Sequence, residues 1–147
     1  MCLEMLVKYP LIDQTVIDYG CGSGILALAA LKLGAKQVFA VDIDPQACEA
    51  SIHNAQLNQM GEDILVVGET ADILPAKADI LVANIVMNPL LQLKDLFVQK
   101  VTDKGYLILS GLLNTQLPTV IEHYQTDFQL LETVHELDWG CLVFQKK

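Results

Sequence analysis

The feature that most constrains the fold is a glycine-rich run, Gly20–Gly24, with glycine at every second position. It directly follows the β-branched segment Thr15–Tyr19 and precedes Ile25–Leu33, whose Leu and Ala residues are typical of a helix that stops at Gly34. A strand, a sharp glycine turn and a helix in this order indicate the first unit of an α/β domain. The glycines also allow a ligand to approach the backbone closely at the end of the strand.

Strand-like and helical segments continue to alternate along the chain. The further predicted strands are Gln37–Val41, Ile64–Val67, Ala78–Ala83 and Tyr106–Ser110. Helices between and after them are indicated by an N-cap residue with a following proline at Asp44-Pro45 and at Asn88-Pro89, and by helical spacing of Leu90, Leu93 and Phe97 and of Leu117, Ile121 and Tyr124. No repeat or linker interrupts the pattern, so we expect one domain over residues 1–147.

The end of the chain departs from this alternation. Phe128–His135 and Trp139–Gln145 are two extended segments with only Glu136-Leu137-Asp138 between them. A parallel pair needs a crossover connection of a dozen or more residues, and there is no room for one here. We therefore expect an antiparallel hairpin at the C-terminal end of a mostly parallel sheet.

The glycine run predicts a nucleoside site of a particular kind. A dinucleotide site has the spacing G-x-G-x-x-G, whereas Ile25 stands here where its third glycine would be. Asp18 would repel the phosphates of a dinucleotide but can attract an ammonium group, directly or through water. S-adenosyl-L-methionine has an ammonium, a sulfonium and no phosphate, so we expect it to bind at Asp18, Gly20, Cys21 and Gly22. The alternative is a tight turn with a purely structural role.

Two further acidic residues stand at the ends of the second and third predicted strands. Asp42 ends the second strand, where a carboxylate can accept hydrogen bonds from both ribose hydroxyls. Its other possible role is to cap the next helix, but Asp44 stands in that position before Pro45, so we expect Asp42 to be free for a ligand. Ile43 is expected to pack on one face of the adenine. Glu69, after the third strand, would reach the adenine amino group or lie in solvent as a loop charge.

Two asparagines follow the fourth predicted strand. Asn84 leaves this apolar strand toward the same edge of the sheet, where its amide would hold the cofactor or fix an incoming amine. The alternative for Asn84 is a turn residue that caps its own backbone. Asn88, directly before Pro89, is expected to cap the helix that follows.

Methyl transfer from a sulfonium needs alignment and exclusion of water more than it needs covalent help from the protein. A lysine nucleophile has an ordinary pKa of about 10.4 and must first lose a proton. An apolar cleft favours the neutral amine, so we expect no dedicated general base, and no His or Glu in the sequence stands out as one.

The charge balance bears on partners. The net charge is −9, with 18 acidic and 9 basic residues, so direct binding of nucleic acid is disfavoured and a basic protein or a cationic small molecule is favoured. The acidity would alternatively serve solubility alone. The cysteines and histidines stand apart from one another in the sequence, so we expect reduced thiols, ordinary surface or half-buried histidines and no metal site. These residues are Cys2, Cys21, Cys48, Cys141, His53, His123 and His135.

Targeting signals are not evident in the sequence. No apolar run approaches the ~20 residues needed to cross a bilayer. The first residues lack the pattern of a secretory signal. We therefore expect a cytoplasmic protein without membrane contact.

The placed residues resemble the catalytic domain of the ribosomal protein L-eleven methyltransferase family. The resemblance rests on Val16–Ala27 (VIDYGCGSGILA), Val41–Ala47 (VDIDPQA), Val82–Val86 (VANIV), Leu107–Gly111 (LILSG) and the run at Trp139, and it covers nearly the whole chain. It implies a Rossmann-like class I methyltransferase fold: a seven-stranded, mostly parallel sheet with helices on both faces, in which the last strand inserts antiparallel between the fifth and sixth.

The resemblance also implies an activity, the S-adenosylmethionine-dependent methylation of lysine and N-terminal amino groups of a large-subunit ribosomal protein. Gly20, Asp42 and Asn84 correspond to cofactor contacts of the family. The family normally has a separate N-terminal domain that recognises the substrate, joined to a threonine-containing loop that touches the cofactor, and we expect this chain to lack both. Asn88 stands where the family more often has a small residue.

Two other functions stay open at this point. One is a small-molecule methyltransferase built on the same core. The other is a non-catalytic module that retains a nucleoside pocket. Intact Asp18, Gly20, Asp42 and Asn84 argue against the second, because a decayed site would have lost some of them.

Overall fold

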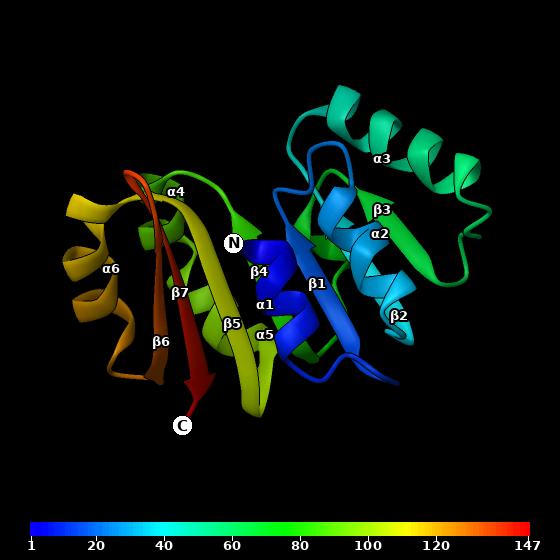
Figure 1. Ribbon diagram of the computed structural model, residues 1–147. Helices are drawn as coiled ribbons and strands as arrows, with labels where there is room; N and C mark the ends of the chain where they lie inside the picture. The colour runs from blue at the N-terminus through cyan, green and yellow to red at the C-terminus, as the bar shows by residue number, and fades with distance from the viewer.

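Seven strands form one sheet with helices on both faces in the computed structural model, which describes residues 1–147 (Figure 1). The strands are β1 (Thr15–Tyr19), β2 (Gln37–Val41), β3 (Leu65–Gly68), β4 (Ala78–Asn84), β5 (Val101–Leu113), β6 (Phe128–Glu136) and β7 (Trp139–Lys146). The helices are α1 (Cys2–Lys8), α2 (Ile25–Lys32), α3 (Pro45–Leu57), α4 (Met87–Gln92), α5 (Lys94–Lys100) and α6 (Leu117–Tyr124), with 3₁₀ turns η1 (Ala71–Ile73) and η2 (Asn114–Gln116).

The strand order is β3-β2-β1-β4-β5-β7-β6. Strands β1 to β5 pair in parallel, and β7 pairs antiparallel with both β5 and β6. The predicted hairpin and the insertion of the last strand between the fifth and sixth are thereby confirmed, and the fold is the Rossmann-like methyltransferase fold. The order reverses beside β1, between β1 and β4. Loops that leave these two strands diverge there and open a crevice for a ligand.

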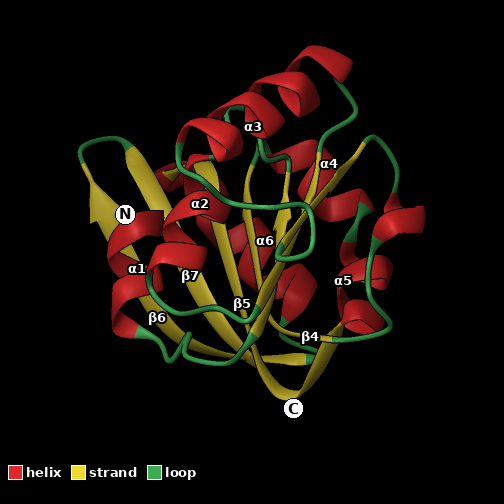
Figure 2. Ribbon diagram, turned by 90° about the vertical axis from the view of Figure 1, so that its right-hand side faces the viewer, coloured by secondary structure: helices red, strands yellow, loops and turns green.

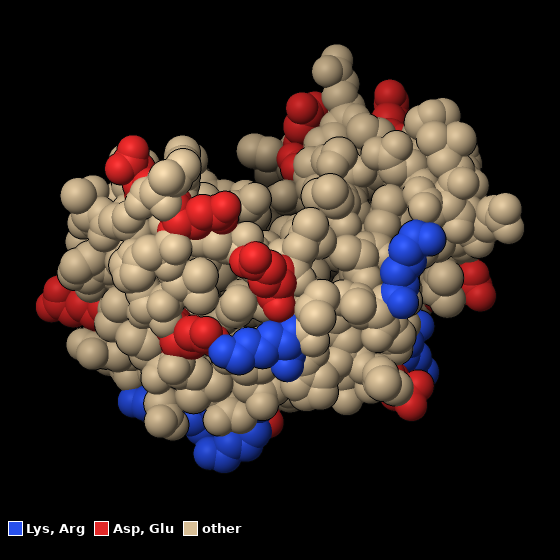
Figure 3. All heavy atoms as spheres, viewed as in Figure 1, with Lys and Arg blue, Asp and Glu red and all other residues tan.

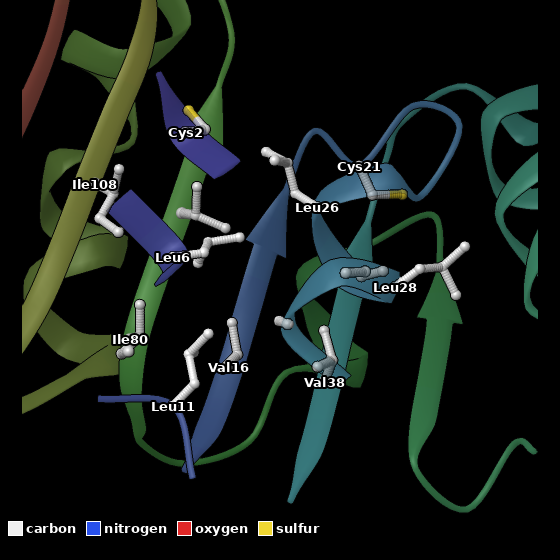
Figure 4. Packing of buried hydrophobic residues seen from close by; sticks show 14 of the residues in the cluster. Cys2, Leu6, Leu11, Val16, Cys21, Leu26, Leu28, Val38, Ile80 and Ile108 are labelled. Atoms are coloured by element: carbon white, nitrogen blue, oxygen red, sulfur yellow. The ribbon is translucent and has the colours of Figure 1, made fainter. Parts of the chain in front are cut away.

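Two apolar clusters hold the helices on the sheet. One joins α1, α2 and α3 to one face, as Leu6, Leu26 and Leu28 pack over Val16 and neighbouring strand residues (Figure 4). The other joins α4, α5 and α6 to the opposite face through buried residues such as Leu90, Phe97 and Tyr124. Figure 2 shows α1 and α2 on one side of the sheet and α4 and α5 on the other. With both faces covered, β1 and β4 are buried along most of their length, and their buried residues are apolar except Asp18.

Local signals account for the ends of the first helices. Asp44 caps α3, because its Oδ1 accepts a hydrogen bond of 2.9 Å from the Gln46 N–H, and Pro45 takes the first helical position. Gly34 follows α2 with a φ of +103°, a conformation that favours glycine. Both predicted signals are confirmed.

The prediction for Asn88 is wrong. Helix α4 begins at Met87 with Val86 as its N-cap, so Asn88 lies inside the first turn and makes no cap hydrogen bond. Pro89 is tolerated as the third residue of the helix because the first N–H groups have no partner within the helix anyway. The single helix expected over Leu90, Leu93 and Phe97 is also divided, since α4 ends at Gln92 and α5 starts at Lys94. No helix in the structure has the length and apolar character needed to cross a membrane.

Candidate active site

A cleft of about 720 Å³ opens beyond the carboxyl ends of β1, β4 and β5. It is lined by the start of α1, the loop after β1 with the first turn of α2, Asn84–Val86, Ser110-Gly111 and Trp139. Figure 3 shows a hollow at the upper edge of the molecule, the edge at which the loop after β1 lies in Figure 1. Nine of the fifteen lining residues are hydrophobic and no lining side chain is charged, so the cleft disfavours charged groups that bring no partner of their own.

The glycine loop has the conformation that its sequence requires. Gly20 has a φ of +81°, and a Cβ built on it would overlap the Cγ2 of Ile85, so the loop and the segment after β4 approach closely. Gly22 also has a positive φ, +54°, but a Cβ there would meet nothing within 4 Å. The Gly22 backbone therefore faces open space, and a ligand can approach it.

The sequence predicted that Asp42 is free for a ligand, but in the structure its carboxylate holds this loop. Its Oδ2 accepts a hydrogen bond of 2.9 Å from the Gly22 N–H, and its Oδ1 accepts one of 3.0 Å from the Asp44 N–H. Asp44 caps α3 as expected, yet Asp42 is used by the backbone as well. An ionised carboxylate offers about four acceptor positions, so Asp42 keeps capacity for ligand hydroxyls while it holds the loop.

Asp18 lies beneath the loop and does not line the cleft. It is 1% exposed, and its Oδ2 accepts a hydrogen bond of 3.0 Å from the N–H of Ala27, the third residue of α2. The carboxylate thus stabilises the positive end of that helix. Its Oδ1 has no hydrogen-bond partner, and burial raises the pKa of Asp18 to about 7. The close approach of a positive group would stabilise the ionised form.

The two residues proposed for the adenine lie farther along the same edge. Ile43 follows β2 with 86% of its surface exposed, and Glu69 follows β3 and is also exposed. The ends of these strands are neighbours, because Asp42 N–H donates to Gly68 O at 3.2 Å. Neither side chain lines the cleft, so the structure places them beside Asp42 on an open surface rather than in an enclosed pocket.

Asn84 stands at the end of β4 and lines the cleft together with Gly20, Cys21 and Gly22. Ser110 lies opposite Asn84 in the parallel register of β4 and β5 and lines the cleft too. Ser110 is 4% exposed and donates a hydrogen bond of 3.4 Å to Gly140 O. Asn84 is exposed, and its amide is available to a ligand.

The thiols and imidazoles do not form a reactive centre. Burial raises the pKa of the Cys21 thiol to about 12, and its sulfur lies 3.4 Å from Ser51 Oγ, so it is a neutral thiol. All four cysteines are free and buried, all three histidines are exposed, and no group of three metal-ligating side chains comes together.

Several lining residues were not predicted as site residues. Ser110 could have been found by the reasoning used for Asn84, since it ends the predicted strand Tyr106–Ser110 and forms the last pair with Asn84 in the parallel register of β4 and β5. Trp139 starts β7 opposite Leu113, and only the antiparallel insertion of β7 beside β5 brings it to this edge. The α1 contribution through Cys2 and Leu3 depends on tertiary packing that no local sequence signal reports.

S-adenosylmethionine fits two features of these residues. The orphaned Oδ1 of Asp18 beneath the loop suits the ammonium group of an amino-acid-bearing ligand, reached through an intervening water. Because Gly22 has no side chain, the space beside it is open, and the cofactor can approach the backbone there. A phosphate-bearing ligand fits less well, because no basic side chain lines the cleft and Asp18 lies below it.

Comparison with known proteins identifies relatives over the whole chain. The profile of a family described as Ribosomal protein L11 methyltransferase (PrmA) matches residues 1–147. A protein named ribosomal protein L11 methyltransferase from Shewanella sp. (strain ANA-3) is 44% identical over 147 residues, which are 100% of this chain and 50% of that protein. Its namesake from Legionella pneumophila (strain Paris) is 42% identical over the same shares.

A solved structure is similar as well. The crystal structure of a ribosomal protein L11 methylase from Lactobacillus delbrueckii subsp. bulgaricus matches with a TM-score of 0.91 and 33% identity, covering 99% of this chain and 77% of that chain. The chain spans about half the length of the curated relatives it matches.

Proposed function

The chain belongs to the ribosomal protein L11 methyltransferase family, and we propose that it is the catalytic domain of an S-adenosylmethionine-dependent protein N-methyltransferase. The observation that carries the proposal is the meeting of the glycine loop and Asn84 in one cleft without charged side chains. The cofactor, when bound, supplies an activated methyl group on its sulfonium.

The residues proposed to hold the cofactor are Gly20, Cys21, Gly22 and Asp42, with Asp18 beneath them. The Asp42 carboxylate accepts hydrogen bonds from the ribose hydroxyls at the acceptor positions that the Gly22 and Asp44 N–H groups leave unused. Asp18 balances the ammonium end from below the loop. Ile43 and Glu69 provide an apolar and a polar contact for the adenine.

Asn84 is the residue proposed to touch the reacting amine. Its amide oxygen accepts a hydrogen bond from the amine and so orients the nitrogen lone pair. The apolar lining favours the neutral form of the amine, which is the nucleophilic form, so the chain needs no side chain as a general base. Ile85, Val86 and Trp139 exclude water from the same space.

The proposed substrate is an amino group, on lysine or at the N-terminus, of ribosomal protein L11. Support comes from the names of the relatives and from the net charge of −9, which favours a basic partner and disfavours direct contact with nucleic acid. We assign residues 1–147 to a single catalytic domain and propose that recognition of the protein substrate depends on a separate region, such as the other half of the relatives. A cytoplasmic location completes the proposal.

Calorimetric titration with S-adenosylhomocysteine tests the cofactor. We expect one site per chain, and binding should be lost when Gly20 is replaced by Ala, because the new Cβ overlaps Ile85. Absence of binding by the wild-type chain would overturn the proposal.

A methylation assay with radiolabelled cofactor tests the substrate. Ribosomal protein L11 and small amines are offered in parallel to the chain and to the chain joined to the remaining half of the Shewanella relative. We expect label on the ribosomal protein, with the joined protein more active. Label on the small amines alone would show that the substrate assignment is wrong.

A further inference from the structure

Helix α3 contacts both loops that carry the proposed cofactor residues, although it does not line the cleft. Three residues spaced three apart, Cys48, Ser51 and Asn54, lie on one face of the helix. Each donates a hydrogen bond to a backbone carbonyl oxygen: Cys48 Sγ to Asp42 O at 3.3 Å, Ser51 Oγ to Gly22 O at 2.9 Å, and Asn54 Nδ2 to Ser23 O at 2.8 Å.

The contact with Ser51 is well enclosed. Ser51 is 0% exposed, and the Cα of Ser51 lies only 3.1 Å from where a Cβ on Gly24 would stand. The loop and the helix are thus packed backbone against backbone, and the hydroxyl satisfies a carbonyl that would otherwise have no partner in this contact. Asn54 makes the equivalent bond nearer the surface.

These bonds determine where the next amide points. All peptide bonds of the chain are trans, so the N–H of each peptide unit points opposite to its C=O. Because the Gly22 carbonyl is directed at α3, the Ser23 N–H is directed away from α3. Ser23 lines the cleft, and its N–H donates no hydrogen bond within the chain. Below it, the first turn of α2 adds the unpaired N–H groups and partial positive charge of a helix N-terminus.

We propose that Ser51 and Asn54 are positioning residues for the cofactor: Ser51 holds the Gly22 carbonyl against α3 and thereby aims the Ser23 amide at the carboxylate of the cofactor's amino-acid end, and Asn54 holds the Ser23 carbonyl and so fixes the adjoining peptide. This inference rests on the proposed function. The carboxylate is the only anionic group of S-adenosylmethionine, and the cleft offers it no basic side chain. Aligned backbone N–H groups are then its donors.

Two ligands that differ only at the amino-acid end test the proposal. S-adenosylhomocysteine carries this end, whereas methylthioadenosine has the same nucleoside and thioether sulfur without it. We expect Ser51→Ala to weaken S-adenosylhomocysteine about tenfold, the effect of one hydrogen bond to a charged group. Methylthioadenosine should change less than about twofold, because it makes no bond to the Ser23 amide.

Asn54→Ala provides a second variant closer to the surface, with an expected loss of about threefold for S-adenosylhomocysteine. Gln56→Ala is the matched control, since Gln56 is exposed on the same helix and donates to neither loop. Thermal unfolding of each variant is recorded in the absence of ligand. A loss of equal size for both ligands in Ser51→Ala would show that Ser51 only holds the fold together and would overturn the proposal.

The Ser23 amide itself gives a direct measurement. In ¹H–¹⁵N spectra of the wild-type chain, S-adenosylhomocysteine should move the Ser23 amide proton downfield, and methylthioadenosine should not. In Ser51→Ala the shift should shrink. An unmoved Ser23 amide in a wild-type chain that binds S-adenosylhomocysteine would contradict this inference alone, whereas a wild-type chain that binds neither ligand would contradict the proposed function and the inference with it.

Discussion

The two walls of the cleft are built differently. The loop wall, formed by Gly20, Cys21, Gly22 and Ser23, is held from behind by hydrogen bonds within the chain, to the Asp42 carboxylate and from α3. The strand wall, formed by Asn84, Ser110 and Trp139, has a single side-chain hydrogen bond, the 3.4 Å contact of Ser110 Oγ with Gly140 O. Trp139 is also 49% exposed.

The difference between the walls suits the two ligands proposed for the cleft, the cofactor and the acceptor amine. A cofactor is always the same molecule, so a rigid wall that is prepared in advance lowers the entropy lost on binding. An acceptor amine arrives on another molecule and must be accommodated at an exposed opening. Stability and cofactor affinity should therefore depend on the loop wall, and the rate of methyl transfer on the strand wall.

The largest expected effect concerns pH and the carboxyl group beneath the loop wall. Burial raises the pKa of Asp18 to about 7 from an ordinary 3.8, so the folded chain holds a proton that the unfolded chain has lost between these values. Unfolding free energy should consequently fall as pH rises from 4 to 7, by about 4 kcal/mol for a shift of this size. Urea unfolding of wild type and Asp18→Asn across this range measures it, and the variant should lack this decline. If the unfolding free energies of wild type and Asp18→Asn changed with pH in parallel, the pKa of Asp18 in the folded chain would not be raised.

Asn84→Ala tests the strand wall. Losing the group that orients the amine should lower kcat/KM about 100-fold, the usual scale for a misplaced reactant. The melting temperature should hardly change, because Asn84 is exposed at a strand end. Steady-state methylation and a melting curve give both values. A variant with full activity would remove Asn84 from the reaction.

Asp42→Ala tests the loop wall. The Gly22 and Asp44 N–H groups would both lose an acceptor, and we expect a loss of about 2 kcal/mol in unfolding free energy. Asp42→Asn keeps one acceptor oxygen and should lose about half as much. Chemical unfolding at fixed pH distinguishes the two. If Asp42→Ala were as stable as wild type, the wall would not depend on this carboxylate.

The smallest effect is expected at the open end of the loop wall. Ile43→Ser removes an apolar contact proposed for the adenine and should weaken S-adenosylhomocysteine about threefold, since the side chain would be only partly covered by a ligand. Leu57→Ser, at an exposed position on α3, is the matched control. An equal affinity of the two variants would place the adenine elsewhere.

Much of the fold could be predicted because its signals are local. The β-branched run Thr15–Tyr19, the cap at Asp44-Pro45 and the short connection between β6 and β7 each act within a few residues, and all three were confirmed. Asn88 failed because its signal is ambiguous: a proline is accepted anywhere in a first helical turn, so Asn-Pro does not fix which residue is the cap.

The site was predicted less completely, for a different reason. Asn84 follows its strand in sequence, so its place at the sheet edge could be deduced. The bonds of Asp42 to Gly22, and of Ser51 and Asn54 to the glycine loop, join segments about 20 to 31 residues apart. Their partners depend on how α3 packs beside the loop. The roles in binding and catalysis of all the proposed site residues stay predictions: Asp18, Gly20, Cys21, Gly22, Asp42, Ile43, Glu69 and Asn84.

One pair of titrations tests the division between the walls most directly. S-adenosylhomocysteine is titrated by calorimetry into Asp42→Ala and Asn84→Ala under identical conditions. We expect a loss of affinity of about tenfold or more for Asp42→Ala, because of the lost hydrogen bonds and the loosened loop, and less than about threefold for Asn84→Ala. Equal losses in the two variants, or a larger loss for Asn84→Ala, would contradict this division.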